Sequence, residues 1–504
     1  MLSIHLRRVM TMTTKRNPLV YLAGVGGAIV TAVVVAALCV VPVPQLMLRP
    51  AALVVTPDPA PPIKICPGGL VDVVGRSTDA TTFQGFAAPN ITTMGQPNTP
   101  AQTVLSAPDN VSDDSTLLPQ LLTGGASSST APDLIAGAQS QLTQSEVISG
   151  LAIAGCGEAS TDQWLVGGST EVGRTSLLFL NNPLEVDSLV TLEIFGEKGR
   201  VDAPGMTNLV VKPRSQRIIS LAAFAPNLVE PVVHVTTTGG QVLASIQQTV
   251  TRVVTPSGVE LVSPGASPSM TQIIPGIALT GQAGQDSEGG QVTSDLAPAV
   301  RVLIPGKKDA EVTVTVIGAT GDPIVIKTNL TAGRTLQLPF LNVPDGIYTA
   351  VVTAPVPVVA GARTISSKFW PMAPDASAPA PTATADAPAP TGLGGDFSWN
   401  ASTLTLSDDV LIPIPSGPNP TLTIYNSGTE IQKVSLLASG RVWQELDVPA
   451  RASRTISLSG QTLLSMTKAV GLNATVTMRD RGLGAAYPVT PASRLGSQIT
   501  VYPR

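Results

Sequence analysis

Charged and aromatic residues are both scarce in this sequence. Charged side chains make up 13% of the 504 residues, the net charge is −4, and aromatic residues make up only 3%. An ordinary soluble protein has roughly 25% charged residues. A chain with so little positive charge creates no field that attracts phosphate, and few aromatic rings leave little surface on which unpaired bases stack. The sequence therefore predicts no nucleic-acid partner.

Histidine is almost absent, which limits the catalytic chemistry. The two histidines are His5 and His234, and a serine or cysteine triad in the main part of the chain would need His234 as its base. His234 lies in "PVVHVT", in the opposite alternation phase to its valine neighbours, which indicates a surface position on a strand. Two histidines, and no cysteine pair at zinc-binding spacing, give no reason to expect a metal or another cofactor.

Three further motifs resemble catalytic or metal-binding sequences but lack essential parts. "GGSTEVG" (167–173) does not have the G-x-S-x-G spacing of a nucleophile elbow, so we expect a loop or bulge. "SMTK" (465–468) fits S-x-x-K, yet the partner motifs S-D-N and K-T-G are missing. Asp109, Asp113 and Asp114 have neither the glycine nor the distal glutamate of a calcium loop, which favours solvated acids. No catalytic residue is predicted.

The N-terminus has the pattern of a membrane anchor. Residues 1–18 contain Arg and Lys but no acid, and residues 19–41 carry no charge over a length sufficient to cross a ~30 Å hydrocarbon core. Positive charge before the span predicts an N-terminus in the cytoplasm and the rest of the chain outside. A cleaved signal peptide and lipid modification at Cys39 are the alternatives. Residues 42–62 are rich in proline, which predicts an extended stalk.

Cys66 and Cys156 are the only cysteines beyond this segment. In an oxidising compartment two such cysteines usually pair, so we expect a structural disulfide between them. Two unpaired buried thiols are the alternative.

One short phrase occurs three times along the chain. "RIISL", "RTLQL" and "RTISL" each place an arginine four residues before a leucine, at Arg217, Arg334 and Arg454. A strand, a turn and a second strand with apolar residues at every other position precede each phrase. We call Arg217, Arg334 and Arg454 the marker arginines. They are predicted to mark the rim of repeated β-sandwiches, a structural role, with ligand binding as the alternative.

The predicted fold class is all-β, with several immunoglobulin-like antiparallel β-sandwich domains following one N-terminal transmembrane helix. The Ser/Asp/Gly-rich segment 106–130 is predicted to be a long loop and the Pro/Ala/Thr-rich segment 373–392 a disordered linker. The predicted boundaries are 1–18 for a cytoplasmic tail, 19–41 for the transmembrane helix, 42–62 for the stalk, 63–263 for the first sandwich region, 264–372 for the second sandwich, 373–392 for the linker and 393–504 for the third sandwich.

Three phrases of this chain resemble a known family. "ICPGGL" (65–70), "WLVGGSTEVGR" (164–174) with "LNNP" after it, and "APAVRVLIPG" (297–306) are similar to an uncharacterised actinobacterial family, a domain of unknown function. Its members have one N-terminal membrane span and a body on the secreted side. The resemblance implies a cell-envelope setting and no particular reaction.

These observations together favour a non-catalytic, membrane-anchored scaffold or accessory protein of the cell envelope. The expected partners are the membrane, crossed once, and another envelope or membrane protein. A module that binds a cell-wall polymer or glycan is the alternative, although such modules usually stack sugars on exposed aromatic rings, and of four tryptophans Trp164 and Trp399 are expected in the core. A hydrolase using two carboxylates is less favoured, and it would need two acids about 5–10 Å apart in a cleft.

Overall fold

The structure is a computed structural model of the 504-residue chain. It describes residues 33, 53–55, 61–73, 82–86, 88–112, 114–125, 133–252, 254–279, 297–340, 343–367, 395–407, 409–491 and 499–501. The chain divides into two compact units, Met1–Pro57 with Gln498–Arg504, and Asp58–Ser497, which we call the body. In the smaller unit β1 (Leu53–Val55) pairs antiparallel with β34 (Ile499–Val501).

Several predicted segments are not covered by this description. The tail 1–18, the transmembrane helix 19–41 apart from Val33, and the linker 373–392 lie outside the described residues. No helix within the described part of the chain is long and apolar enough to cross a membrane.

The body is all-β, as predicted, and its named sheets are antiparallel. Its strands follow the alternation seen in the sequence: in β21 (Ala310–Ile317) Val312, Val314 and Val316 are buried and the threonines between them are half-buried. Because successive side chains of a strand point to opposite faces, such a strand covers a core with one face only.

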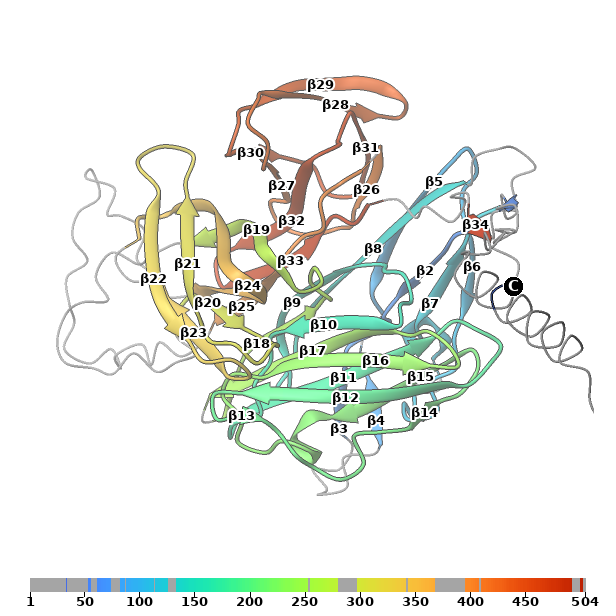
Figure 1. Ribbon diagram of the computed structural model, residues 1–504. Coiled ribbons are helices and arrows are strands. Elements are labelled where there is room, and N and C mark those ends of the chain that lie inside the picture. The colour runs from blue at the N-terminus through green and yellow to red at the C-terminus, as the bar shows by residue number, and fades with distance from the viewer. Residues whose placement is uncertain are drawn as a thin grey trace, which may run out of the picture. The chain divides into compact units, whose positions relative to one another are not determined.

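Three modules of the body share one strand order (Figure 1). In each module the first, sixth, third and fourth strands form one sheet, and the fifth, second, seventh and eighth form the other. In the first module these sheets are β10-β16-β12 with β13 and β14 beside β12, and β15-β11-β17-β18. Its strands are β10 (Asp162–Val166), β11 (Arg174–Asn182), β12 (Ser188–Gly196), β13 (Gly199–Arg200), β14 (Leu209–Val211), β15 (Ser215–Ser220), β16 (Val232–Thr238), β17 (Leu243–Arg252) and β18 (Thr255–Val262).

The third module repeats this order with β26-β31-β28-β29 and β30-β27-β32-β33. Its strands are β26 (Val410–Ile414), β27 (Thr421–Asn426), β28 (Gln432–Ala438), β29 (Arg441–Val448), β30 (Ala452–Ser457), β31 (Thr462–Thr467), β32 (Leu472–Asp480) and β33 (Leu483–Pro488).

The second module reaches the same order with one long strand. The N-terminal half of β24 (Gly346–Ser367) pairs with β19 and β21, and its C-terminal half pairs with β20 and β25, so β24 acts as both sixth and seventh strand. The other strands are β19 (Ser269–Leu279), β20 (Ala299–Leu303), β22 (Ile324–Leu330), β23 (Thr335–Pro339) and β25 (Gly395–Ala401).

The pairing of β25 shows that the predicted linker 373–392 does not separate the second module from the third. The sequence places 395–401 at the start of the third region, but the structure pairs these residues with β24, and Gly395 lies opposite Ser367. The two ends of 368–394 therefore meet in one hairpin. The segment connects two strands of the second module, and the covalent passage to the third module comes after Ala401.

Each module has its own hydrophobic core between its two sheets. The first is built around Leu178, Val190, Val235 and Ile246, the second around Val300, Val314 and Val352, and the third around Ile424, Leu436 and Val476. Phe397 and Trp399 of β25 belong to the core of the first module, so the eighth strand of one module completes the core of another.

The N-terminal region carries three small sheets, β2-β7-β6, β3-β4 and β5-β8-β9. Here the structure differs from the predicted loop 106–130, because β7 lies within it and pairs with both β2 and β6. Leu121 and Leu122 are fully buried, and the polar residues around them masked this short strand in the sequence. The strands are β2 (Ile63–Cys66), β3 (Val71–Val73), β4 (Phe83–Gly85), β5 (Asn90–Gln96), β6 (Ala101–Val104), β7 (Gln120–Thr123), β8 (Leu134–Gln144) and β9 (Ser149–Gly155).

Four strands converge where the modules meet. β9 lies beside β18 and β33, and β25 also lies beside β18 and β33, so the four form a closed group with one strand from the N-terminal region and the eighth strand of each module. We call this group the central strands. It joins the modules through packing rather than through a continuous ladder.

Candidate functional site

A carboxylate from β25 is buried among the central strands. Oδ1 of Asp396 accepts the backbone N–H groups of Val259 (3.1 Å) and Phe397 (3.0 Å), and Oδ2 accepts those of Leu151 (2.8 Å) and Gly484 (3.2 Å). Burial raises the pKa of Asp396 to about 8, and these four hydrogen bonds oppose that rise. One side chain therefore ties β9, β18 and β33 to β25.

Glu260 of β18 is also buried at this junction. Its Oε1 accepts the backbone N–H of Leu261 (2.9 Å), while Oε2 has no hydrogen-bond partner among the described residues. Burial raises the pKa of Glu260 well above its usual value, and the nearby Asp396 adds to this rise. Asp396 holds the strands together, and both acids are closed to solvent, so we assign them a structural role.

Two arginines stack on a buried tryptophan between the first and second modules. The guanidinium carbon of Arg301 lies 4.5 Å from the ring centre of Trp399, and that of Arg363 lies 5.8 Å from it. Arg301 Nη1 donates to the carbonyls of Gly168 (3.0 Å) and Pro231 (2.8 Å). Burial lowers the pKa of Arg301 to about 9, and the charge of Glu230 opposes this.

This contact explains the glycines of "GGSTEVG". Gly168 has φ +90°, and a Cβ on Gly167 would lie 2.9 Å from Val262 and 3.2 Å from the Trp399 ring. The adjacent Ser169 is buried and its hydroxyl donates to the Leu228 carbonyl (3.2 Å). The segment fits a close-packed loop, and Ser169 is not presented as a nucleophile.

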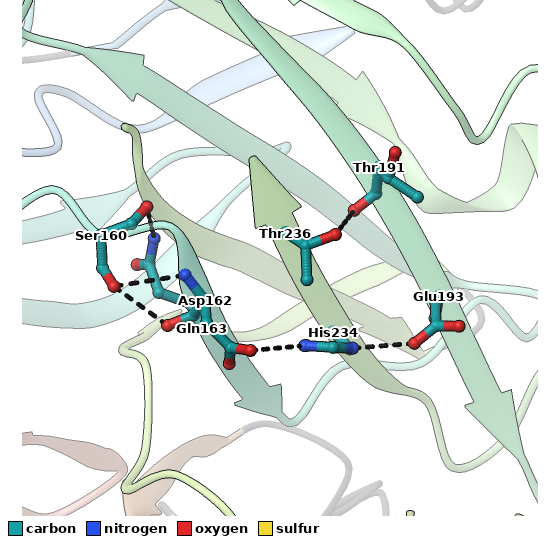
Figure 2. Close-up of polar contacts among 7 residues, drawn as sticks. All are labelled: Ser160, Asp162, Gln163, Thr191, Glu193, His234 and Thr236. Atoms are coloured by element: carbon teal, nitrogen blue, oxygen red, sulfur yellow. Dashed lines mark hydrogen bonds and ion pairs between the residues drawn. The ribbon is translucent and has the colours of Figure 1, made fainter. Parts of the chain in front are cut away.

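The side chains best suited to acid–base chemistry lie in a row across β10, β16 and β12 (Figure 2). His234 is paired with Trp164 on one side and Glu193 on the other. Its Nδ1 lies 2.8 Å from Glu193 Oε2, and its Nε2 lies 3.3 Å from Asp162 Oδ2. The imidazole also stacks on the Trp164 ring, with centroids 3.9 Å apart. As expected, His234 faces away from the core that Val233 and Val235 enter.

This arrangement does not form a catalytic triad. A triad needs one imidazole nitrogen held by a carboxylate and the other directed at a nucleophile. Here carboxylates face both nitrogens. Ser160, drawn beside them in Figure 2, donates its hydroxyl to the Asp162 carbonyl (3.1 Å). Glu193 also forms a salt bridge with Arg200, whose Nη2 lies 2.9 Å from Glu193 Oε1. The imidazole fills the space between the two acids where a carboxylate-dependent hydrolase would place its substrate.

Asp162 also lines a cavity of about 540 Å³. Residues of the N-terminal region, the first module and the third module line it, and most are aliphatic, proline or glycine. Its polar lining includes Lys64, Glu158, Asp162, Gln163 and Ser245. The amide of Gln163 is used internally: Nε2 donates to the Val242 carbonyl (2.6 Å) and Oε1 accepts the Ala244 N–H (3.1 Å).

The marker arginines occupy related places on different edges. Arg217 lies on β15 and Arg454 on β30, which are edge strands of equivalent sheets, and Arg334 directly precedes the equivalent edge strand β23. Arg217 Nη1 donates to the Val210 carbonyl (2.8 Å) and Arg454 Nε to the Asp447 carbonyl (3.2 Å), each seven residues earlier in the fourth strand. The structure does not gather the three around one pocket.

The remaining candidates have separate positions. Cys66 and Cys156 form a disulfide between the end of β2 and the residue after β9. Asp109 accepts the Ile218 N–H (2.8 Å), Asp114 caps a short 3-10 helix, Ser115–Leu117, and Asp113 lies outside the described residues. Ser465 is buried in β31, whereas Lys468 follows the strand and is exposed.

In the part of the chain that the structure describes, no group of three or more His, Cys, Asp or Glu side chains could hold a metal ion. Sequence reasoning missed Asp396 and the cavity. The available signal for Asp396 was the phrase Ser-Gly-apolar, which occurs at 149–151 and 257–259 near the start of two central strands. The last residue of each phrase, Leu151 or Val259, donates its backbone N–H to Asp396.

These features define a protein built of repeated β-modules around a shared centre. The chain belongs to a family of unknown function (DUF5719), which matches residues 109–459. None of the curated proteins matches the chain. A solved structure titled "Biofilm associated protein - BSP domain" aligns with 84% of this chain and 67% of its own at 12% identity, with a TM-score of 0.11. A likeness this weak carries no argument about fold or function.

Proposed function

We propose that this protein is a non-catalytic scaffold or accessory protein of the cell envelope. The observation that carries the proposal is the set of three modules with one strand order, packed on the central strands and held there by Asp396. Such a body keeps several sheet edges and loops in fixed relative positions. This is what a protein that positions partners requires.

The setting of the scaffold follows from the N-terminal sequence. The uncharged segment 19–41, with basic residues before it, anchors the chain in the cell membrane as a single span, with its N-terminus in the cytoplasm and the body outside. The disulfide Cys66–Cys156 suits an oxidising, extracytoplasmic location. The resemblance noted for the sequence supports an actinobacterial cell envelope as the setting of this proposed role.

The modules are variants of the immunoglobulin-like sandwich. In the immunoglobulin fold the second strand pairs with the fifth and the third lies in the sheet of the sixth. The same pairings occur here, for example β11 with β15 and β12 with β16. Relative to the seven-stranded immunoglobulin order, the first, fourth and seventh strands lie in the opposite sheets, and the seventh pairs with an added eighth strand.

Affinity capture of the detergent-solubilised full-length protein tests the scaffold role. The expected result is co-purification of a defined envelope or membrane protein, retained after nuclease treatment. A matched bait carrying Asp396→Asn, which disturbs the arrangement of the modules, should retrieve less of that partner. Capture of no envelope component by the folded wild-type protein would contradict the proposal.

A glycan-binding role is the second candidate, and one residue favours it. Trp164 and Trp399 are buried, as predicted, and Trp370 lies outside the described residues, but Trp443 is 50% exposed. It lies on the edge strand β29 at a register shift between Leu437↔Val442 and Leu436↔Gln444. Bulges of this kind redirect a side chain, and an exposed indole can stack on a sugar ring.

Sedimentation with isolated cell wall tests this second role. Wild-type protein should pellet with the wall, and Trp443→Ala should remain in the supernatant, while the neighbouring Val442→Ala serves as the matched control. Equal pelleting of Trp443→Ala and wild type would remove Trp443 from consideration.

A further inference from the structure

The fourth strand lies at a sheet edge in each of the three modules, and β22 is the fourth strand of the second module (Figure 1). An edge strand leaves one row of backbone N–H and C=O groups without a ladder partner, and such a row can accept a further strand. Proteins usually prevent this with short edge strands, bulges or charged side chains. The three equivalent edges of this protein differ in these features.

The edges of the first and third modules carry such features. In the first module β13 has two residues and β14 has three. In the third module β29 has a register shift against β28 and carries the charged residues Arg441, Glu445 and Asp447. Short length, irregular shape and charge all oppose the addition of a strand at these two edges.

The marker arginine of each of these two modules also covers its edge. Arg217 donates to the carbonyl of Val210, and Arg454 donates to the carbonyl of Asp447. The opposite side of each fourth strand is paired with the third strand of its module, so the residues that the arginines contact direct their backbone groups outward. In an antiparallel strand the N–H and C=O of one residue point to the same side.

β22 has none of these protections. It is seven residues long, pairs with β21 without a register shift, and carries one charged residue, Lys327. Lys327 lies seven residues before Arg334, the spacing found in the other modules, but Arg334 is exposed and makes no hydrogen bond or ion pair with the described residues. Val325 is 54% exposed. Among the described residues, this edge is regular, largely apolar and uncovered.

The two faces of β22 indicate which side chains an added strand would carry. Ile324 and Ile326 are half-buried against the core of the second module, which favours aliphatic side chains beside them. On the other face the Lys327 side chain is 61% exposed, and its Nζ lies 4.0 Å from Glu311 Oε1. An exposed pair at this distance is weak.

The charges at this edge favour an acidic partner. Arg334 is at the position from which the other marker arginines reach the fourth strand, so it adds a second exposed cation to that of Lys327. Acidic side chains on an added strand would pair with both cations. A second copy of the chain would instead bring its own Lys327 and Arg334 to the same edge, where like charges repel.

We propose that the outer edge of β22 binds an extended segment of a partner protein as an added strand, with aliphatic side chains beside Ile324 and Ile326 and acidic side chains facing Lys327 and Arg334. This inference deepens the proposed scaffold role by naming how a partner is held, and to that extent it rests on the proposed function.

Fluorescence anisotropy with the full-length protein tests the edge directly. The probe is a labelled heptapeptide amide, Ser-Val-Glu-Val-Glu-Val-Ser. The competitor Ser-Val-Lys-Val-Lys-Val-Ser reverses its charge, and Ser-Glu-Glu-Val-Val-Val-Ser keeps its composition but removes the alternation. We expect saturable binding of the probe and about tenfold weaker competition by each of these peptides than by the unlabelled probe. Full competition by either peptide, or no binding at millimolar concentration, would overturn the proposal.

Val325→Pro tests the strand pairing. Val325 lies two residues from Lys327, so by the equivalence of the modules its N–H is directed outward. Proline removes this N–H and is tolerated on an edge strand where the N–H faces solvent. The thermal midpoint should stay close to that of wild type while probe affinity falls several-fold. A folded Val325→Pro protein that binds the probe as tightly as wild type would contradict the proposal.

Arg334→Glu tests the charge assignment without touching the strand. Because Arg334 is exposed and bonds no described residue, its replacement should leave thermal stability unchanged while probe affinity falls several-fold. Arg441→Glu, at an exposed position on β29, changes the net charge equally and is the matched control. Equal probe affinity in Arg334→Glu and Arg441→Glu would remove Arg334 from the site and refute the acidic partner.

Affinity capture and analytical ultracentrifugation distinguish this edge from the alternatives. If wild-type protein retrieves a partner and folded Val325→Pro retrieves it equally well, the edge proposal fails while the scaffold role stands. If the probe binds as described but no partner is retrieved, the scaffold role fails while the edge proposal stands. Concentration-dependent dimers that Val325→Pro abolishes would assign the edge to a second copy of the chain and overturn the proposal.

Discussion

At the scale of single residues, Asp396 has the widest structural reach. Its two oxygens accept backbone N–H groups from four residues, three of them on other strands. A backbone N–H buried without an acceptor costs roughly 1–3 kcal/mol. The loss of this carboxylate therefore affects contacts between modules rather than one module alone.

Asp396→Asn should destabilise the body strongly. The amide NH₂ would replace one oxygen and face two N–H donors, so we expect a loss of about 3 kcal/mol or more in the free energy of unfolding. Urea unfolding above pH 8, where the Asp396 carboxyl is ionised, followed by tryptophan fluorescence measures this. A loss below about 1 kcal/mol would show that the hydrogen bonds of Asp396 do not hold the centre together.

Stability should fall as pH rises from about 4 to about 8. Burial raises the pKa of Asp396 to about 8 and that of Glu260 well above its usual value. Over this range the folded protein keeps protons that the unfolded chain releases, so unfolding is favoured as pH increases. Urea titrations at pH 5 and pH 8 should give the higher midpoint at pH 5, and Glu260→Gln should reduce the difference. A higher midpoint at pH 8 would contradict this sign.

Arg301 and Arg454 should respond very differently to truncation. Arg301 is buried, bonds the carbonyls of Gly168 and Pro231, and stacks on Trp399. Arg454 is exposed and bonds one carbonyl. Thermal denaturation should show a loss of about 3 kcal/mol for Arg301→Ala and under about 1 kcal/mol for Arg454→Ala. A loss for Arg454→Ala as large as that for Arg301→Ala, about 3 kcal/mol, would refute the assignment of the marker arginines to a modest structural role.

At the scale of elements, β25 is the strand on which the arrangement depends. It pairs with β24 of the second module, places Phe397 and Trp399 in the core of the first, and lies beside β33 of the third. One strand of seven residues therefore contacts all three modules.

The hairpin of β24 and β25 should tolerate replacement of its connecting segment, 368–394, by a two-residue turn. Because Ser367 and Gly395 lie opposite each other, replacing 368–394 with Asn-Gly should close the hairpin and preserve the fold. The thermal midpoint and the far-ultraviolet circular dichroism should match wild type. Removing 395–401 in addition should abolish cooperative unfolding. Loss of fold in the first variant alone would contradict the pairing.

The sequence predicted where strands form better than it predicted which strands pair with one another. Alternating valines gave strands such as β21, and the marker arginines gave equivalent edge strands, because both signals are local. β7 was hidden because two buried leucines in a polar stretch do not form a readable period. β25 was assigned to the third region because composition locates a Pro/Ala-rich segment but not whether its ends meet.

Part of the candidate site was readable and part was not. The alternation of valines placed His234 on the outer face of its strand. The carboxylates that bracket it, the Trp164 stack, the carboxylate of Asp396 and the cavity all depend on contacts between residues tens to hundreds of positions apart. Apart from the repeated Ser-Gly-apolar phrase at 149–151 and 257–259, no local pattern records such contacts.

At the scale of the body, the central strands make the three modules one structural unit. Separate β-sandwiches on flexible linkers would unfold independently, whereas modules that share core residues and a buried carboxylate should unfold together. The proposed scaffold role needs this coupling, because partners bound at different edges keep their spacing only if the modules do not move relative to one another.

Differential scanning calorimetry of the full-length protein tests this central claim most directly. A cooperative body should give one main transition whose calorimetric and van't Hoff enthalpies agree, and Asp396→Asn should broaden or split it. Three separate transitions in the wild-type protein, unaffected by Asp396→Asn, would contradict the account.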